Sequence, residues 1–487
     1  MERSTAQLYG LALLLLAIAT TVFCTVQLNG IDFWLQAKVG ELIAIHHVIP
    51  ETLLFPFTEV ASDTFHAHEW LASLLFHYEL QWLGEDYMPL LIGLHGALLF
   101  LLAAILGYLK SNGSPFHALI AGFVTVLMEN YRHVMRPELP AILVMMCFWI
   151  ALEHFHQRPR WLPAIVAPLL MVAWTNMHGS FVLGVVLAGA FGSNALWRFI
   201  RRHARAPQEL HDFLRWVALG AVIILATLLN PEGIHLWTFV LDFGTNSANR
   251  VLTEWYPTLD KRMHMLPGLW IALTGWLATI ALCIWQWKRL TLIEVLLVAV
   301  FSVLFFRAIR FPVFFALVSG YVFASLFPAH QAFRERSWAM ACVVASGLLC
   351  VAALLFGRVS RPEASGTFDH YRFSPLLVKK LADPSMQGNV FNQMEQGAEL
   401  IYRAYPRLKP MVDCRFDSYS QEYLDYLEAL RRDDKLFDEF VARYDVRYLM
   451  MDSDGYQQFQ SLPRATSGRW AHDFNDQYII ILKRVDH

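Results

Sequence analysis

Long apolar runs recur along this chain, and they constrain its fold more than any other feature. A helix needs roughly 20 apolar residues to cross a bilayer core, or about 17 when neighbouring helices help, and about eleven runs meet that measure. Their centres lie near Leu15, Leu98, Val124, Met146, Leu169, Val186, Ile223, Leu273, Val298, Val318 and Val344. We therefore expect a mostly α-helical, polytopic transmembrane bundle in which the first apolar run is retained as a span.

The composition agrees with a membrane protein. Hydrophobic residues make up 56% of the 487 positions and charged residues only 16%, which is too apolar for a soluble protein of this length. The net charge of −2 argues against a nucleic-acid partner, which would require a basic face to neutralise phosphates. Lipid is the partner that the composition favours.

Basic residues gather in alternate loops between the predicted spans. These loops carry Lys110, Arg158 with Arg160, the cluster from Arg198 to Arg205, Lys288 with Arg289, and Arg334 with Arg336. Because Lys and Arg are retained on the cytoplasmic side, the pattern predicts a cytoplasmic N-terminus. An odd number of spans then delivers the hydrophilic tail to the outer face, although a miscount by one would move the tail without changing the loop pattern.

We expect two domains. Residues 1–357 form the transmembrane domain, with a large outer loop at 29–88 and a second outer loop at 231–266. Within the first loop, apolar residues recur at helical spacing in 33–45 and 70–83, which favours helices lying in the membrane interface. Residues 358–487 read as an extracytoplasmic α/β domain. Its expected strands are 389–392, 409–413, 446–452 and 478–483, and its expected helices include 396–405 and 421–430.

Two acids of the first outer loop are candidates for chemistry. Asp32 lies just outside the first span beside Phe33 and Trp34, and a carboxylate in such low-dielectric surroundings can act as a general base or bind a cation. The alternative is a helix N-cap, for which Asp is favoured. Glu69 follows His68, and this pair could bind a divalent metal or a phosphate. A polar helix start explains that pair as well.

Further polar residues collect at the outer ends of the spans. They are Arg132, His133, Arg136, Glu138, His178, Glu254, Arg307 and Arg310. Arginines at the outer ends run against the usual preference of Lys and Arg for the cytoplasmic side. A phosphate or pyrophosphate partner would account for them through bidentate, charge-assisted bonds. Internal ion pairs with Glu138 or Glu254 are the alternative, and both can hold together. In the tail, Asp413 and Arg415 follow an expected strand, where either a ligand site or a salt-bridged turn would fit.

These residues also carry a family resemblance. The motifs are Asp32-Phe33-Trp34 with Gly40, Glu69-Trp70-Leu71, Arg136-Pro137-Glu138, Thr175-Asn176-Met177-His178-Gly179, Asn230-Pro231-Glu232-Gly233, Glu254-Trp255, Gly388-Asn389-Val390-Phe391-Asn392, Gly397 and Asp413-Cys414-Arg415-Phe416-Asp417-Ser418-Tyr419. Through them the chain resembles a bacterial family of multi-span membrane glycosyltransferases of the GT-C class. Each motif is short, but together they cover most of the chain.

The resemblance implies an inverting transferase of the bacterial inner membrane that takes a sugar from a polyprenyl-phosphate donor on the extracytoplasmic face. The acceptor would be a glycan, a lipid or a protein. Asp32 is then the catalytic base and Glu69 the second catalytic carboxylate. Substrate binding falls to His68, Arg136, Glu138, His178, Glu254, Arg307 and Arg310. No cofactor is required, and a divalent metal is compatible with this scheme.

Two other classes of function compete with this hypothesis. A multi-span transporter or lipid flippase would also need a large bundle, but it would place ionisable groups near the midplane, where His95 is the clearest one. A binding module in the tail, anchored by the spans, is the other alternative. Eleven or so spans are far more than an anchor requires.

Overall fold

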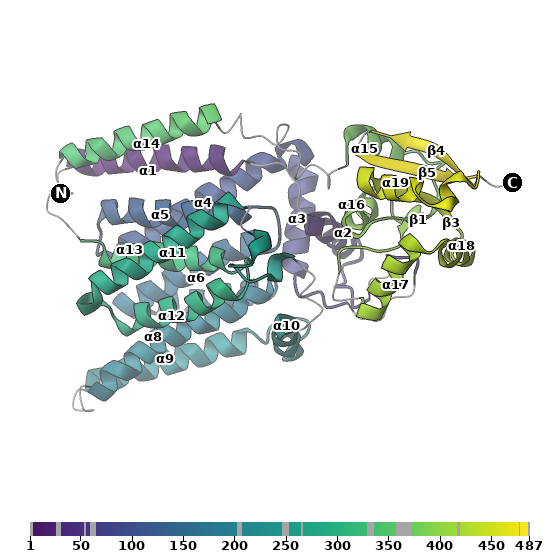
Figure 1. Ribbon diagram of the computed structural model, residues 1–487. Helices are drawn as coiled ribbons and strands as arrows, with labels where there is room; N and C mark the ends of the chain where they lie inside the picture. Colours follow the sequence, from purple (N-terminus) through teal and green to yellow (C-terminus); the bar gives the residue numbers. More distant parts are fainter. Residues whose placement is uncertain are drawn as a thin grey trace. The chain divides into compact units, whose positions relative to one another are not determined.

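The computed structural model describes residues 3–25, 31–52, 55–58, 65–201, 207–245, 253–263, 266–328, 336–356, 373–415, 419–476 and 478–485. The chain divides into two compact units, which are drawn together in Figure 1. One unit, here the helical unit, comprises Met1–Gln27 and Glu85–Arg361. The other, here the mixed unit, joins Leu28–Gly84 to Pro362–His487, so the first outer loop belongs to the same compact body as the tail.

The helical unit is a bundle of α-helices. They are α1 (Arg3–Cys24), α4 (Met88–Lys110), α5 (Pro115–Glu129), α6 (Glu138–Gln157), α7 (Trp161–Thr175), α8 (Val182–Arg201), α9 (Pro207–Ala226), α10 (His235–Thr245), α11 (Pro267–Trp285), α12 (Leu292–Arg307), α13 (Pro312–Leu326) and α14 (Arg336–Phe356). Every predicted span centre lies inside one of these helices, and α10 is the additional helix. Six helices of the described chain are long and apolar enough to cross a membrane by length and composition. The expected polytopic helical bundle is confirmed.

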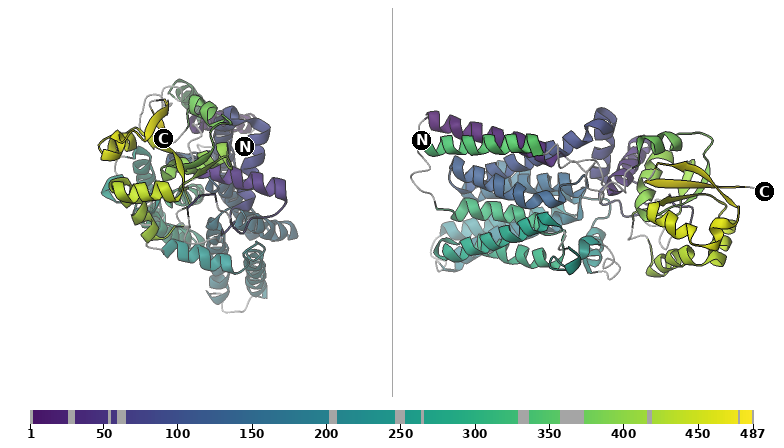
Figure 2. Two further views of the ribbon diagram at one scale, coloured as in Figure 1. Left: turned by 90° about the vertical axis from the view of Figure 1, so that its right-hand side faces the viewer. Right: turned by 45° about the horizontal axis from the view of Figure 1, so that its top comes forward.

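The helices of the bundle run alongside one another, as the second view in Figure 2 shows. Almost every residue of α13 is buried, so this helix forms the centre of the unit, packed against α4, α5, α11 and α12. In contrast, α1 and α14 pair with each other, with Tyr9 near Cys342 and Leu15 near Gly347. Those two neighbouring pairs show that α1 and α14 run in the same direction.

Contacts between loops define two ends of the helical unit. At one end, Lys110 of α4 pairs with Glu294 of α12. At the other, the Nδ2 of Asn130, just after α5, lies 3.4 Å from Cys24 Sγ at the end of α1. We call the first the basic end and the second the rim end. Because α14 runs parallel to α1, both of these helices finish at the rim end.

The mixed unit is built on a five-stranded sheet with strand order β2-β1-β3-β5-β4. The strands are β1 (Gly388–Phe391), β2 (Leu408–Pro410), β3 (Val446–Asp452), β4 (Trp470–Asn475) and β5 (Ile479–Arg484). β1 pairs in parallel with β2 and β3, whereas β5 is antiparallel to β3 and β4. The expected α/β tail is confirmed, and β3 has the bounds that the sequence predicts. β4 was not expected.

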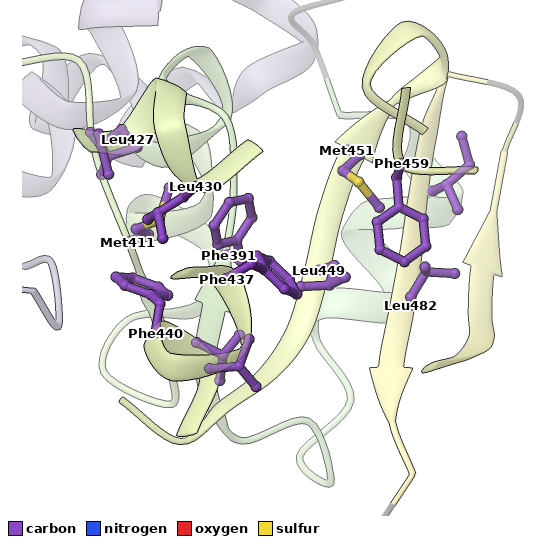
Figure 3. Packing of buried hydrophobic residues seen from close by; sticks show 14 of the residues in the cluster. Phe391, Met411, Leu427, Leu430, Phe437, Phe440, Leu449, Met451, Phe459 and Leu482 are labelled. Carbon is purple, nitrogen blue, oxygen red and sulfur yellow. The ribbon is translucent and has the colours of Figure 1, made fainter. Parts of the chain in front are cut away.

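Helices complete the mixed unit around this sheet. They are α2 (Ile31–His46), α3 (Trp70–Leu83), α15 (Pro375–Leu381), α16 (Met394–Ala404), α17 (Gln421–Arg432), α18 (Asp434–Arg443) and α19 (Ser453–Gln460). On one face, Phe391, Phe437 and Leu449 pack with Leu482, as Figure 3 shows. A second core on the other face contains Val390, Leu400 and Tyr448. Neighbouring strand residues alternate between the two cores, as period-2 geometry requires.

Individual hydrogen bonds also join the first outer loop to the rest of the mixed unit. The backbone N–H of Phe57 donates to Pro410 O at 3.0 Å, on the edge strand β2 of the sheet. Thr58 donates to Met411 O at 2.8 Å and accepts a hydrogen bond from Tyr423. α2 and α3 approach closely at Gly40, where an added Cβ would lie 2.9 Å from His77 Cβ. The outer loop therefore adds structure to the tail domain.

Candidate functional site

A cluster of ion pairs lies at the rim end of the helical unit. Arg132 ends the short helix η2 (Asn130–Arg132), Arg136 precedes α6, Glu138 begins α6, Glu254 lies in η5 (Thr253–Trp255), and Arg310 separates α12 from α13. We call these five residues the rim cluster. Three segments that are far apart in the sequence thus supply charged side chains to one place.

Glu254 is the centre of the rim cluster. Its carboxylate accepts hydrogen bonds from Arg136 Nη1 at 2.7 Å, Arg132 Nη2 at 3.2 Å and Arg310 Nη1 at 3.3 Å. Arg132 Nη2 also donates to Glu138 Oε2 at 3.2 Å. The internal ion pairs that the sequence offered as an alternative are therefore present. Their convergence on a single carboxylate orders three guanidinium groups together.

Burial and charge act against each other in this cluster. Burial alone would raise the pKa of Glu254, but the charges of Arg310, Arg132 and Arg136 outweigh it and hold that pKa well below its usual range. Burial likewise disfavours the Arg132 cation, yet the carboxylates of Glu138 and Glu254 raise its pKa. Glu254 and Arg132 are consequently charged near neutral pH.

The rim cluster is not saturated with hydrogen bonds. Arg132 Nε and Glu138 Oε1 are buried and have no hydrogen-bond partner among the residues that the structure describes. The Glu138 side chain is only 9% exposed, at the first position of α6. Buried polar atoms without a partner are costly, so a cluster that retains them is suited to receive a further polar group.

Aromatic residues brace the arginines. The Arg310 guanidinium lies over the Trp255 ring, 4.8 Å from its centroid, and that ring makes an edge contact with Phe311. Tyr131, next to Arg132, donates to Ile309 O at 2.5 Å. Cation–π contact with a partly buried ring favours one orientation of the guanidinium plane. The arginines are thereby held ready before any ligand arrives.

The hydrogen bonds of His178 assign its ring tautomer. The backbone N–H of Ser180 donates to His178 Nδ1 at 3.1 Å, so this ring nitrogen is an acceptor and the ring proton lies on Nε2. Trp174 Nε1 donates to Ser180 Oγ at 3.0 Å and so fixes the serine. His178 lies within electrostatic reach of Glu138. Arg307, the last residue of α12, is exposed.

In the mixed unit, the two predicted catalytic acids lie on adjoining helices. Asp32 is in the first turn of α2, where the helix dipole favours a carboxylate. Gln36, one turn later on the same face, donates to Glu69 Oε2 at 2.6 Å and accepts a hydrogen bond from Ser73. Glu69 immediately precedes α3, and His68 Nε2 lies 3.7 Å from its carboxylate. Gln36 thus links the Asp32 face of α2 to Glu69.

The segment after β2 lies close to Asp32. Asp413 and Arg415 form a bidentate pair, with Arg415 Nη2 2.7 Å from Asp413 Oδ2, so the salt-bridged turn that the sequence offered is present. Between them, burial raises the pKa of the Cys414 thiol, and the charges of Asp32 and Asp413 raise it further. Asp417, which the same motif contains, lies outside the described residues.

A metal centre was one reading of His68 and Glu69. The described part of the chain has no group of three or more His, Cys, Asp or Glu side chains arranged to hold a metal ion. His95, the clearest ionisable group within a span, bonds Leu91 O one turn back in its own helix at 2.9 Å. That contact is typical of a structural histidine.

Gln36 and Ser180 are among the polar residues of these two sites that the sequence did not single out. Gln36 had a detectable signal, because its position four residues after Asp32 places it on the same helix face. Ser180 had none, since only the turn between α7 and α8 reveals that its backbone N–H reaches His178.

No protein-family model and no curated protein matches the chain. Solved structures do. The apo form of the oligosaccharyltransferase from Archaeoglobus fulgidus is similar with a TM-score of 0.56 and 14% identity, over 96% of this chain and 73% of that one. The same enzyme, AglB, in complex with an inhibitory peptide and a dolichol-phosphate, gives a TM-score of 0.54 at 14% identity, over 96% and 72%.

ArnT from Cupriavidus metallidurans, bound to undecaprenyl phosphate, is similar along its whole length. The TM-score is 0.56 at 12% identity, and the match covers 99% of this chain and 98% of that one. At these identities the likeness concerns the fold. The chain therefore has the GT-C fold of multi-span membrane glycosyltransferases, as its motifs led us to expect. Another structure of the Archaeoglobus enzyme contains zinc and sulfate.

Proposed function

We propose that this protein transfers a sugar from a polyprenyl-phosphate-linked donor to an acceptor on the extracytoplasmic face of the bacterial inner membrane. The acceptor is a glycan, a lipid or a protein. The observation that carries the proposal is the convergence of three arginines on Glu254 at the rim end. Structures with the same fold hold dolichol-phosphate and undecaprenyl phosphate, whose headgroups such arginines suit.

In this proposal the rim cluster binds the donor phosphate. Arg132, Arg136 and Arg310 present guanidinium groups that Glu254 and Trp255 already hold in place, so little side-chain entropy is lost on binding. The Nε2–H of His178 supplies a neutral donor, and Arg307 supplies a further cation. Glu138 faces the acceptor or the sugar through its open oxygen.

The chemistry is a single displacement at the anomeric carbon. The acceptor oxygen forms a bond to that carbon while the bond from the carbon to the phosphate oxygen breaks. The electron pair leaves with the polyprenyl phosphate, whose charge the arginines stabilise. Asp32 takes the acceptor proton, and Glu69, held by Gln36, assists in orienting the acceptor. A single displacement inverts the anomeric configuration.

The orientation of the protein rests on its loops. The basic residues of the alternate loops favour a cytoplasmic basic end, which places the rim end and the tail outside. The scheme assigns no step to a metal. Activity after chelation, with and without added Mg²⁺ or Mn²⁺, establishes whether a divalent cation contributes.

The test of the catalytic role is Asp32→Asn in purified full-length protein. Transfer is measured from a panel of undecaprenyl-phosphate-linked hexoses and pentoses. Because general base catalysis contributes about 10²–10⁴-fold, we expect turnover to fall by that factor. Binding of undecaprenyl phosphate should be unchanged. Near-normal turnover would remove Asp32 from the role.

Glu41→Gln is the matched control for that test. It makes the same change from acid to amide on the same helix, at a residue paired with Lys38 at 3.1 Å. We expect it to retain turnover within about two-fold. If both variants lose activity equally, the loss reports on α2 as a whole and not on Asp32.

A transporter or lipid flippase is the alternative from another class. Reconstituted liposomes separate the two functions. A transferase consumes the donor and releases one polyprenyl phosphate for each glycosylated product, whereas a flippase moves the lipid across the bilayer with its chemistry unchanged. Translocation without product would overturn the transferase.

A further inference from the structure

We propose that Arg403 of the C-terminal domain is a positioning residue for Asp32, acting through the Trp34 ring. This inference rests on the proposed function, because it assigns the tail a part in the same reaction. It gives α16 the task of holding the first turn of α2. All of the contacts concerned lie within the mixed unit.

Trp34 is the contact point on α2. It lies two residues after Asp32 in the same helix, and it is only 2% exposed. The guanidinium carbon of Arg403 lies 4.4 Å from the centroid of the Trp34 ring, and the Tyr402 ring lies 5.0 Å from it. Two successive residues of α16 thus contact the Trp34 ring, and Trp34 belongs to the same helix as Asp32.

Arg403 is itself held in place by Glu399 of the same helix. Its Nη2 donates to Glu399 Oε1 at 3.0 Å, one helical turn earlier. Glu399 is 1% exposed, and its Oε2 accepts a hydrogen bond from the backbone N–H of Phe373 at 3.1 Å. A buried carboxylate with a backbone donor cannot easily turn away. The Arg403 guanidinium is therefore restrained between Glu399 and the Trp34 indole. Its cation–π contact both attracts the indole and fixes the position of the ring.

α16 also touches the segment that follows β2. At Gly397 the helix approaches the chain after β2 so closely that an added Cβ would clash with Val412 O and lie 2.8 Å from Asp413 Cα. The neighbouring Cys414 lies within electrostatic reach of Asp32. One short helix thus contacts both the element that bears Asp32 and the segment next to it. Figure 1 shows α2 beside α16 in this unit.

The expected consequence is a loss of turnover with little loss of donor binding. A displacement of about 1 Å in a reacting group can cost up to about 10²-fold in rate. Loss of the Arg403 contact with the Trp34 ring should cost less. We expect Arg403→Gln to lower kcat about ten-fold and to change the donor KM less than two-fold, because the rim cluster is untouched. Arg403→Lys, which keeps the cation over the ring, should recover part of the rate.

The chain offers a closely matched control. Arg432 pairs with Glu428 at 2.7 Å, with the same spacing of four residues and in a helix of the same domain, but its side chain is 72% exposed. Arg432→Gln should leave kcat unchanged. Hydrogen–deuterium exchange of the full-length protein supplies a readout that is independent of activity. Arg403→Gln should speed exchange in residues 31–46, and Arg432→Gln should not.

Double variants decide whether Arg403 acts through Trp34. If it does, Arg403→Gln lowers kcat no further in a Trp34→Leu background. An additional ten-fold loss there would overturn the proposed route. If Asp32→Asn abolishes transfer but Arg403→Gln leaves both kcat and the exchange of α2 unchanged, the inference fails and the proposed function stands. If Asp32→Asn is fully active, Asp32 is not the base, and if the native protein transfers no sugar, the proposed function fails. In both cases the exchange data alone show whether α16 holds α2.

Discussion

The helical unit carries a buried charge cluster at each end, and the two differ in how completely their bonds are made. At the basic end, Lys110 lies 2.7 Å from Glu294, which also accepts hydrogen bonds from Ser325 and Thr291. Nearby, Glu153 accepts from Gln157 at 2.9 Å and Tyr321 at 2.8 Å, and Lys110 lies over the Tyr321 ring. We call this the basic-end network.

The rim cluster also consists of buried ion pairs, but not all of its hydrogen bonds are made within the described residues. Three arginines share Glu254, while Glu138 Oε1 and Arg132 Nε have no partner among the described residues. A network whose polar atoms all have hydrogen-bond partners rigidifies the bundle. A network in which some polar atoms lack partners can accept hydrogen bonds from, or donate them to, a ligand. The comparison therefore separates a structural use of buried charge from a binding use within one bundle.

The largest effect should come from breaking the basic-end network. Lys110→Met leaves Glu294, which is fully buried, without its cation. Loss of one partner of a buried ion pair costs about 3–5 kcal/mol, so thermal unfolding of the purified protein should show a destabilisation of that size. Donor affinity of the protein that remains folded should not change.

The double variant Lys110→Met with Glu294→Gln controls for the unpaired charge. The amide keeps an acceptor for Thr291 and Ser325 while removing the negative charge. Most of the lost stability should return. If the double variant is as unstable as Lys110→Met, the ion pair is not what stabilises this end.

A smaller loss, in binding rather than stability, is expected at the rim. Arg310→Gln removes one guanidinium from Glu254 and from the proposed phosphate. Hydrogen bonds to charged groups contribute about 1.5–3 kcal/mol, so the Kd for undecaprenyl phosphate should rise about 10–100-fold. Arg262→Gln, which removes an arginine with a 58% exposed side chain paired with Asp260, should leave that Kd unchanged. Equal affinity in all three proteins would place the lipid phosphate elsewhere.

The smallest effect concerns Glu79, whose carboxylate is largely removed from solvent and whose Oε2 has no hydrogen-bond partner among the described residues. Burial raises the pKa of Glu79 in α3 to about 7, from a usual value of 4.5. Its neutral form therefore stabilises the fold fully below pH 4.5, and this stability is lost as the pH rises through about 7. Glu79→Gln should melt with the native protein at pH 4.5 and about 2–4 °C higher at pH 8. A constant difference in Tm across that range would contradict the assignment.

Sequence patterns predicted the elements whose periodicity is strong. Every span centre fell within a helix, and the bounds of α3 matched the amphipathic stretch 70–83, because apolar residues at helical spacing leave few other folds. β2 ends at Pro410, short of the expected 413, since the backbone N–H of Asp413 donates to Tyr419 instead of continuing the sheet. β4 escaped prediction because none of its residues is buried and its burial pattern shows little alternation.

Candidate residues were predicted from position more readily than contacts were. Arginines at the outer ends of spans are conspicuous in the sequence, and so Arg136 and Arg310 could be named in advance. Glu254 could be named only as one possible partner. Its convergence with all three arginines could not be predicted, because it reaches them from a loop more than a hundred residues beyond Arg136. The same holds for Arg403 and Trp34, whose contact depends on the first outer loop folding with the tail.

The central claim is that the rim cluster binds the phosphate of a polyprenyl lipid. An electron cryomicroscopy structure of the full-length protein with undecaprenyl phosphate tests it most directly. We predict headgroup density within hydrogen-bonding distance of Arg132, Arg136 and Arg310, with the open oxygen of Glu138 facing the same space. Headgroup density at the basic end, beside Lys110 and Arg289, with the rim cluster unchanged, would contradict the claim.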